Sequence, residues 1–392
     1  YISAFAMFYL QDKSLLEFQR KTQERIRKNN LTNVFKVSNI PSDTQIRTLI
    51  DNHSYEPLQD VFADYFHRLQ RNKTIEKFKF LNSFLIPIDA TQYFISENVN
   101  CKKCLVKESK KSETKQYYHQ ILQATLVHPD FRQVIPLAPE FISNSDGTKK
   151  QDCEIKAGKR MLKRIRRAHK MLPMIIVGDD LYSRQPFIEE LLKNKFSFIL
   201  VCKPASHKHL FEEIDSFRKG NYLATYEYKD KKGKRYLYEW VNQVTLNANN
   251  KTIKVNFAEF SIFNGEKRTY HNSWVTDIEI TKDNVVDIVR GGRARWKIEN
   301  EGFNTLKNHG YHLEHNFGHG DKNLSEAFFI LNLLAFFFHQ IFELTDQLYQ
   351  QARAVFSARI EYWNCIRSAI RLIIFDEWDD VLLKIWAPDK FP

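Results

Sequence analysis

The amino-acid sequence predicts an α/β fold, a mixed sheet flanked by helices, and three observations support this prediction. Short apolar runs alternate with helical stretches between residues 83 and 205, which is typical of a sheet covered on its faces. The pattern then takes a period of two between residues 222 and 263, and helical spacing dominates both ends of the chain. With 43% apolar residues and only 12 glycines in 392, the chain can build a large core, which excludes disordered and collagen-like classes.

The first 82 residues are predicted to be helical, and short strands follow them. Ser42 can cap a helix, and Gln45 three residues later completes a capping box. The first strand is expected to begin at Phe84 and to end at the acid Asp89. Further elements expected up to residue 205 are strands at 123–127, 133–137, 174–178 and 196–202, and helices at about 151–170 and 186–195.

The period-two segment indicates a β-rich insertion. Tyr226–Tyr228 and Tyr236–Tyr238 flank a polar, glycine-containing stretch, which is typical of a hairpin. Helical spacing resumes near Asp283 and continues to the end of the chain. The predicted regions are an N-terminal helical region (1–82), a first core part (83–205), the β-rich insertion (206–278), a second core part (279–345) and a C-terminal helical region (346–392).

The composition also limits the partners. The chain has 59 Lys and Arg against 47 Asp and Glu, a net charge of +12, which predicts a polyanion as partner, either nucleic acid or an anionic membrane surface. The longest apolar stretch, Ala327–Phe338, is shorter than the ~20 residues of a membrane-spanning helix, so we expect a buried helix and no membrane partner. Five cysteines are too few for a disulfide scaffold, which indicates a reducing, cytoplasmic compartment.

Three acids stand out by their context. Asp89 and Asp179 each follow an apolar run, and the carboxyl ends of strands are where α/β sheets usually bind ligands. Glu299 lies on a predicted helix, four residues after Arg295. Clustered carboxylates repel one another unless a hard divalent cation such as Mg²⁺ or Mn²⁺ joins them, and two such ions about 4 Å apart promote phosphodiester displacement. The acids therefore indicate metal-dependent phosphodiester chemistry.

The segments that carry these acids also resemble a family. IPIDATQYF around Asp89, IIVGDDLYS around Asp179, a β-rich insertion and RARWKIENEGFNTLKN around Glu299 resemble the DDE transposases of bacterial insertion sequences, and among them the IS-four-like group. The resemblance runs from about residue 39 to the late 330s. It implies an RNase H-like core in which Asp89, Asp179 and Glu299 are the catalytic, metal-binding triad, with Arg295 beside them as a contact to DNA phosphates.

The sequence departs from the signature of that family at two places. The signature has a Tyr three residues before the Arg, and Gly292 stands there. It has a Lys seven residues after the Glu, where this chain has Leu306, with Lys307 one residue further on. Two alternatives stay open: Glu301 could replace Glu299 as the ligand, and Asp180 could replace Asp179.

Further contacts to DNA are expected outside the triad. Lys307, Arg293 and Lys203 are candidates for phosphate contacts. Trp274, 25 residues before Glu299, could stack on a flipped base, as the resemblance implies, or could be a core residue. The basic run at residues 159–167 could be a DNA-binding ridge or a solvated helix face. The N-terminal helices are expected to bind the terminal inverted repeats.

A second, unrelated metal site is suggested by cysteines. Cys101 and Cys104 are spaced as half of a zinc site, which Cys153 or His119 would have to complete. The alternative is two ordinary reduced cysteines. Four histidines between residues 309 and 319 could bind a transition metal, or could serve packing or contacts to the DNA backbone.

The resemblance implies a DNA transposase that cleaves element ends and transfers the 3′-OH to target DNA. Such an enzyme is expected to act as a homodimer on the nucleoid of the bacterial cytoplasm. Two other functions fit the residues: an RNase H-like nuclease without strand transfer, and a catalytically inert DNA-binding protein derived from a transposase. The presence of all three acids argues against the inert protein.

Overall fold

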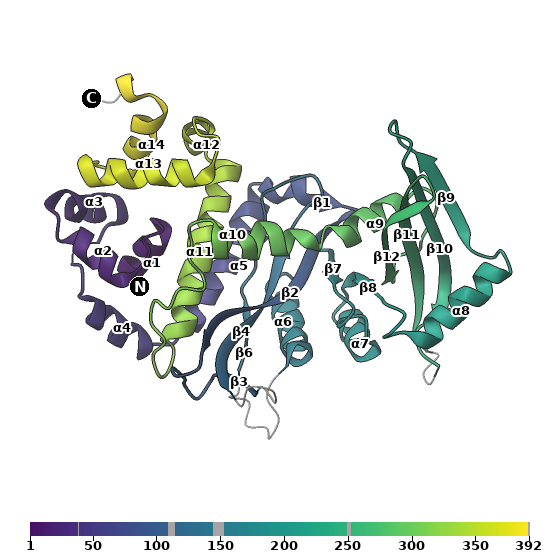
Figure 1. Ribbon diagram of the computed structural model, residues 1–392. Helices are drawn as coiled ribbons and strands as arrows, with labels where there is room; N and C mark the ends of the chain where they lie inside the picture. The colour runs from purple at the N-terminus through teal and green to yellow at the C-terminus, as the bar shows by residue number, and fades with distance from the viewer. Residues whose placement is uncertain (38, 109–113, 144–152, 249–251, 391–392) are drawn as a thin grey trace.

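The computed structural model describes residues 1–392 except 38, 109–113, 144–152, 249–251 and 391–392, and one mixed sheet forms its centre (Figure 1). Neighbouring strands follow the order β3-β4-β2-β7-β8-β12-β11-β10-β9, and β1, β5 and β6 pair at the side. The strands are β1 (Lys79–Phe80), β2 (Ser83–Ser96), β3 (Leu105–Glu108), β4 (Lys115–Leu126), β5 (Ile135–Pro136), β6 (Glu140–Ile142), β7 (Met174–Gly178), β8 (Ser197–Val201), β9 (Ala224–Lys229), β10 (Arg235–Thr245), β11 (Lys254–Asn264) and β12 (Lys267–Thr276).

Helices cover both faces of this sheet. On one face, Gly158 of α6 lies against Leu122 of β4, and on the other face Gly291 of α9 lies against Leu85 of β2. This confirms the predicted α/β class, a mixed sheet flanked by helices. The helices are α1 (Ile2–Tyr9), α2 (Leu15–Thr22), α3 (Arg25–Phe35), α4 (Asp43–Asp51), α5 (Glu56–Arg71), η1 (Thr74–Phe78), α6 (Glu154–Ala168), α7 (Gln185–Lys193), α8 (Lys208–Lys219), α9 (Val285–Arg293), η2 (Ile298–Phe303), α10 (Asn304–Asn308), α11 (Leu324–Thr345), α12 (Gln347–Ala354), α13 (Arg359–Leu372), α14 (Trp378–Trp386) and η3 (Pro388–Lys390).

The central strands carry the pairing that positions the site. β2 pairs with β7 in parallel from Phe84 to Pro87, and β7 pairs with β8 in parallel. All five residues of β7 are buried, as its apolar run predicts for a strand covered on both faces. The prediction that the first strand ends at Asp89 is wrong, because β2 continues to Ser96 in antiparallel pairing with β4.

The predicted β-rich insertion forms strands β9–β12 with helix α8 before them (Figure 1). Its hairpin is confirmed, since Tyr228 pairs with Tyr236 across the turn and Gly233 adopts a positive φ of 77°. The insertion does not form a sheet of its own. β12 pairs with β8 through Trp274 and Val201, so the inserted strands extend the core sheet.

The two ends of the chain form one helical group (Figure 1). The Asn30 amide of α3 donates to the carbonyls of Ile370 and Ile373, at 2.6 and 2.7 Å, and its oxygen accepts the backbone N–H of Phe375. Because Asn30 is buried, these bonds fix α3 against α13. The predicted capping box of Ser42 and Gln45 begins α4.

Helix α11 is the central helix between this group and the sheet. It runs for 22 residues, longer than the apolar stretch Ala327–Phe338 from which it was predicted. By length and composition it could cross a membrane, with a mean hydropathy of 1.7, but 78% of its most apolar part is buried inside the fold, as predicted for a core helix. Its start is held by Asp51, whose carboxylate accepts the backbone N–H groups of residues 321–324.

Candidate functional site

The acids Asp89 and Asp179 emerge from neighbouring parallel strands. The last parallel pair between β2 and β7 joins Pro87 to Val177, and each acid lies two residues beyond its member of that pair. Side chains along a strand alternate between the two faces of the sheet, so a residue two positions further on points to the same face. Asp89 and Asp179 therefore leave the sheet on the same side. That side carries α9, and the chain after α9 carries Arg295 and Glu299.

Arg295 joins the acids. Its Nη1 lies 2.8 Å from Asp89 Oδ2 and 2.5 Å from Glu299 Oε1, and the guanidinium also interacts electrostatically with Asp179. The Asp89 and Arg295 side chains are largely buried, whereas Glu299 is 48% exposed. Burial raises the pKa of Asp89 to about 7, and the hydrogen-bonded Glu299 adds to the rise while Arg295 opposes it. The site therefore holds more negative charge than one arginine balances.

The helix with the two candidate glutamates is π-helical from Ile298 to Phe303. Glu299 points to Arg295 and Asp89, whereas Glu301 faces the other way, 4.0 Å from the Arg132 guanidinium. Single π turns inside helices are frequent at functional sites. The geometry thus brings Glu299, rather than Glu301, to the acids.

The π turn also accounts for the displaced lysine. In a regular helix, the seventh residue after Glu299 lies within about 20° of it around the axis. A π turn holds one residue more than an α turn, so the eighth residue, Lys307, takes that direction while Leu306 is buried. Lys307 pairs with Glu314 at 2.8 Å, on the segment that leaves α10.

The neighbouring aspartates after β7 have different surroundings. Asp180 accepts the backbone N–H of Lys203 at 2.7 Å and the hydroxyl of Ser206, so it holds the turn that follows β8. Asp179 accepts only a local bond among those described, from the N–H of Leu181 at 3.0 Å, and it interacts with Arg295. The geometry favours Asp179 as the third member of the acid group.

A fourth acid near this group was not predicted. Glu154, in the first turn of α6, accepts a hydrogen bond from the Gln120 amide at 2.8 Å and one from the Tyr182 hydroxyl at 3.4 Å. Burial raises its pKa, and the charge of Asp179 contributes to the rise. A glutamate in the first turn of a helix is common, since it interacts well with the helix dipole, so nothing in its sequence context indicates that it lies near Asp179.

Trp274 is buried in the core of this structure, so its indole is not exposed for stacking on a base. Its side chain is 0% exposed. A Cβ atom at Gly292 would lie 2.5 Å from its Nε1, so the indole fills the space beside Gly292. This explains the first departure from the signature, because Trp274 occupies the volume next to the position where the family has a tyrosine. The exposed tryptophan of this region is Trp296, at 43%.

The other basic residues expected to contact DNA lie in different surroundings from one another. The Arg293 guanidinium lies over the rings of Tyr270 and Phe260 in the insertion, at 4.9 and 5.6 Å. Lys203 is exposed in the turn held by Asp180. The structure therefore brings Arg295 to the acids, while Arg293, Lys203 and Lys307 lie on different segments and contact other residues.

Three arginines of the basic run on α6 bond to neighbouring elements, while Lys163 in the same run stays 57% exposed. Arg160 and Arg164 pair with Glu140 at 2.7 and 2.9 Å. Arg166 donates to the carbonyls of Asn194 and Leu172 at 2.8 and 3.0 Å. These arginines join α6 to β6 and to the turn before β8.

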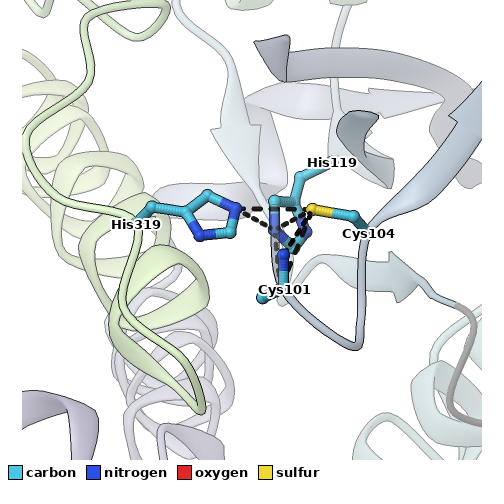
Figure 2. Close-up of side chains that lie close together, drawn as sticks. All are labelled: Cys101, Cys104, His119 and His319. Atoms are coloured by element: carbon cyan, nitrogen blue, oxygen red, sulfur yellow. Dashed lines mark hydrogen bonds between the residues drawn. The ribbon is translucent and has the colours of Figure 1, made fainter. Parts of the chain in front are cut away.

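A second group of possible metal ligands lies elsewhere (Figure 2). Cys101 and Cys104 meet His119 of β4 and His319, and the four ligand atoms lie within 4.8 Å of one another. His119 was one of two residues expected to complete a zinc site, whereas Cys153 lies exposed at the start of α6. His319 comes from the histidine tract, and its meeting with the cysteines was not predicted.

Comparisons with known proteins identify the family. A family model described as the transposase DDE domain matches residues 86–337. Among solved structures, the chain is similar to a cryo-EM structure of the piggyBac transposase synaptic complex with hairpin DNA, with 11% identity and a TM-score of 0.33, over 73% of this chain and 57% of that one. A search of curated proteins finds no match. Because the family model covers more than half of the sequence and includes all three acids, the chain belongs to the DDE transposases.

Proposed function

We propose that this transposase cleaves DNA at the ends of its element and transfers the freed strand to target DNA, with Asp89, Asp179 and Glu299 as the catalytic acids. The observation that carries the proposal is the position of Arg295, which contacts Asp89 and Glu299 and interacts with Asp179. These interactions with one guanidinium support a common site for the three acids. The membership of the family supports phosphodiester chemistry at that point.

The acid group suits a hard divalent cation. Its donors are carboxylate oxygens, which Mg²⁺ and Mn²⁺ prefer. Burial and the neighbouring Glu299 raise the pKa of Asp89, so a cation bound there would compete with a proton for that carboxylate. When bound, such ions supply Lewis-acid stabilisation of the phosphate oxygens.

The protein's own groups would then hold the DNA in place. Arg295 fixes the directions of Asp89 and Glu299 before substrate binds. Lys307, Arg293 and Lys203 would contact phosphates around the site, which positions the scissile bond without reading its sequence. The N-terminal helices would bind the terminal inverted repeats, a homodimer would hold two ends, and the enzyme would act on the nucleoid in the bacterial cytoplasm.

The test compares two neighbouring aspartates. Asp179→Asn should abolish cleavage of element-end DNA in Mg²⁺ and leave DNA binding in a gel shift within a few-fold of wild type. Asp180→Asn is the matched control, and cleavage should persist because Asp180 holds a turn. Full cleavage by Asp179→Asn would refute the assignment. With paired-end DNA, joined products indicate strand transfer, whereas nicks alone indicate a nuclease.

A further inference from the structure

Four potential metal ligands from distant parts of the chain converge next to the sheet (Figure 2). Cys101 and Cys104 lie in the turn between β2 and β3, and His119 lies in β4. His319 lies about 200 residues later, between α10 and α11. Cys104, His119 and His319 are buried, and Cys101 is partly buried. A chance meeting of surface groups would not place all four ligand atoms at one protected point.

The distances match a tetrahedral zinc site. The two sulfur atoms lie 3.8 Å apart, His119 Nε2 lies 3.5 Å from each sulfur, and His319 Nε2 lies 3.4 Å from Cys104 Sγ. The two histidine Nε2 atoms lie 3.0 Å apart. A tetrahedral Zn²⁺ with ordinary bond lengths separates sulfurs by about 3.8 Å, sulfur from nitrogen by about 3.5 Å and nitrogens by about 3.3 Å. The four separations that involve sulfur agree with this geometry within about 0.1 Å, and the two nitrogens lie about 0.3 Å closer than it requires.

The orientation of His319 also indicates a cation. Its Nδ1 lies 3.0 Å from the carbonyl oxygen of Gly320 and donates to it, so Nε2 of the neutral ring presents a lone pair to the cluster. A hydrogen bond from the second nitrogen to a carbonyl is how zinc-binding histidines are usually oriented. A cation at the centre of the cluster would accept this lone pair together with the other three ligand atoms.

Hydrogen bonds also order the turn that contains Cys101 and Cys104. The backbone N–H of Cys101 donates to Cys104 Sγ at 3.3 Å, and the N–H of Cys104 donates to the carbonyl of Cys101 at 3.2 Å. The hydrogen bond from the Cys101 N–H fixes the position of the Cys104 sulfur within the turn. The sulfur separation of 3.8 Å is also far beyond a disulfide bond.

We propose that Cys101, Cys104, His119 and His319 bind one structural Zn²⁺. Two thiolates and two imidazoles are a donor set that selects zinc over Mg²⁺ or Mn²⁺. All four coordination positions are taken by side chains, so the ion has no place for water or substrate, which is typical of structural sites. This site is separate from the acid group and stands whether or not the proposed function is correct.

The ion would join two segments that carry the acid group. His119 pairs with Phe94 on β2, five residues after Asp89 on the same strand. His319 ends the segment that follows the helix of Glu299 and Lys307. Lys103, inside the cysteine turn, adds an ion pair of 3.1 Å with Glu326 of α11. Zinc would therefore hold the strand of Asp89 and the connection from α10 to α11 in a fixed relation.

The test measures metal content directly. The full chain, purified without chelator, should contain about one zinc per chain by inductively coupled plasma mass spectrometry. His319→Ala and Cys104→Ser should lose most of it. Matched controls are His315→Ala, from the same tract, and Cys365→Ser, a cysteine far from the cluster, and both should keep stoichiometric zinc.

A second measurement covers the case in which these variants fail to fold. His319→Cys supplies a new thiolate and should retain zinc, and Co²⁺-substituted wild type should show the intense visible bands of a tetrahedral thiolate site. Folded wild-type protein without zinc, or zinc content unchanged in both His319→Ala and Cys104→Ser, would overturn the proposal. A Cys101–Cys104 disulfide in the folded, metal-free protein would do the same.

Discussion

The acid group and the Cys/His cluster are both built from segments far apart in sequence, but they balance their charge differently. In the acid group, the Arg295 guanidinium lies 2.8 Å from Asp89 and 2.5 Å from Glu299, so the protein supplies part of the positive charge itself. In the Cys/His cluster, the sulfurs and imidazole nitrogens face one another and the ligand atoms are mostly buried. The first can exist without a metal ion, and the second is complete only with one.

This difference indicates two kinds of metal use. A group balanced by arginine and partly open, as the 48% exposure of Glu299 shows, suits ions that enter with substrate and leave. A closed set of four soft and borderline ligands suits an ion that stays for the life of the protein. The same chain would thus use metal once for chemistry and once for shape.

The largest expected effect tests the acid group through its two candidate glutamates. Glu299→Gln should lower the cleavage rate at least about 10²–10³-fold, the size typical of removing a group that stabilises the transition state. Glu301→Gln should cleave within a few-fold of wild type, since its side chain faces Arg132. Cleavage assays on element-end DNA in Mg²⁺ measure both. A reversed order of the two variants would assign the ligand to Glu301.

The next effect separates the two sites by removing metal. Dialysis into magnesium-free buffer should stop cleavage, leave the melting temperature nearly unchanged, and be reversed at once by Mg²⁺. Removal of zinc by a strong chelator should lower the melting temperature by about 5 °C or more, because the ion stabilises only the folded chain. Thermal denaturation and metal analysis on the same samples check this. Equal melting temperatures for the zinc-containing and the zinc-free protein would contradict a structural role for the zinc ion.

A smaller effect concerns the arginine that balances the acids. Arg295→Gln leaves Asp89 and Glu299 without their counterion, so in magnesium-free buffer it should destabilise the fold by about 1–3 kcal/mol. Mg²⁺ should restore stability to the variant more than it adds to wild type. Urea denaturation with and without Mg²⁺ measures the difference, and Arg295→Lys is the charge-conserving control. An identical response to Mg²⁺ in wild type and Arg295→Gln would show that Arg295 does not balance the acids.

The smallest expected effect lies beside the cysteines. Lys103→Ala removes the ion pair with Glu326 and should cost about 0.5–1 kcal/mol, because the lysine is 24% exposed but Glu326 is nearly buried. Zinc content should stay stoichiometric, since Lys103 is not a ligand. Lys102→Ala, at the neighbouring position in the turn, is the control. Loss of zinc from Lys103→Ala would mean that the pair, rather than the metal, shapes the turn.

The sequence could predict the features that depend on local pattern. The apolar run Met174–Gly178 formed a buried strand with Asp179 at its end, and Ser42 and Gln45 formed their capping box. The RARWKIEN segment placed Glu299 four residues from Arg295, and the two side chains do meet. Each of these features involves residues that are close together in the sequence, so the local pattern of apolar and polar residues was enough to predict it.

Contacts across long separations could not be predicted in the same way. His319 and Cys104 are 215 residues apart, and nothing in either segment indicates the other. Strand β12 is polar at its start, so its pairing with β8, and with it the burial of Trp274, was not visible. The arginines of α6 looked available to DNA because a sequence does not show which carbonyls a side chain will meet.

The π turn from Ile298 to Phe303 has a consequence for length variation in this helix. Insertion of a residue into an ordinary helix rotates everything beyond it by about 100°, which would carry Lys307 away from the side of Glu299. Here the surplus residue is absorbed within one wide turn. Shortening that turn by one residue would give a regular helix with the lysine at the spacing of the family, so relatives of either length could keep the same active arrangement.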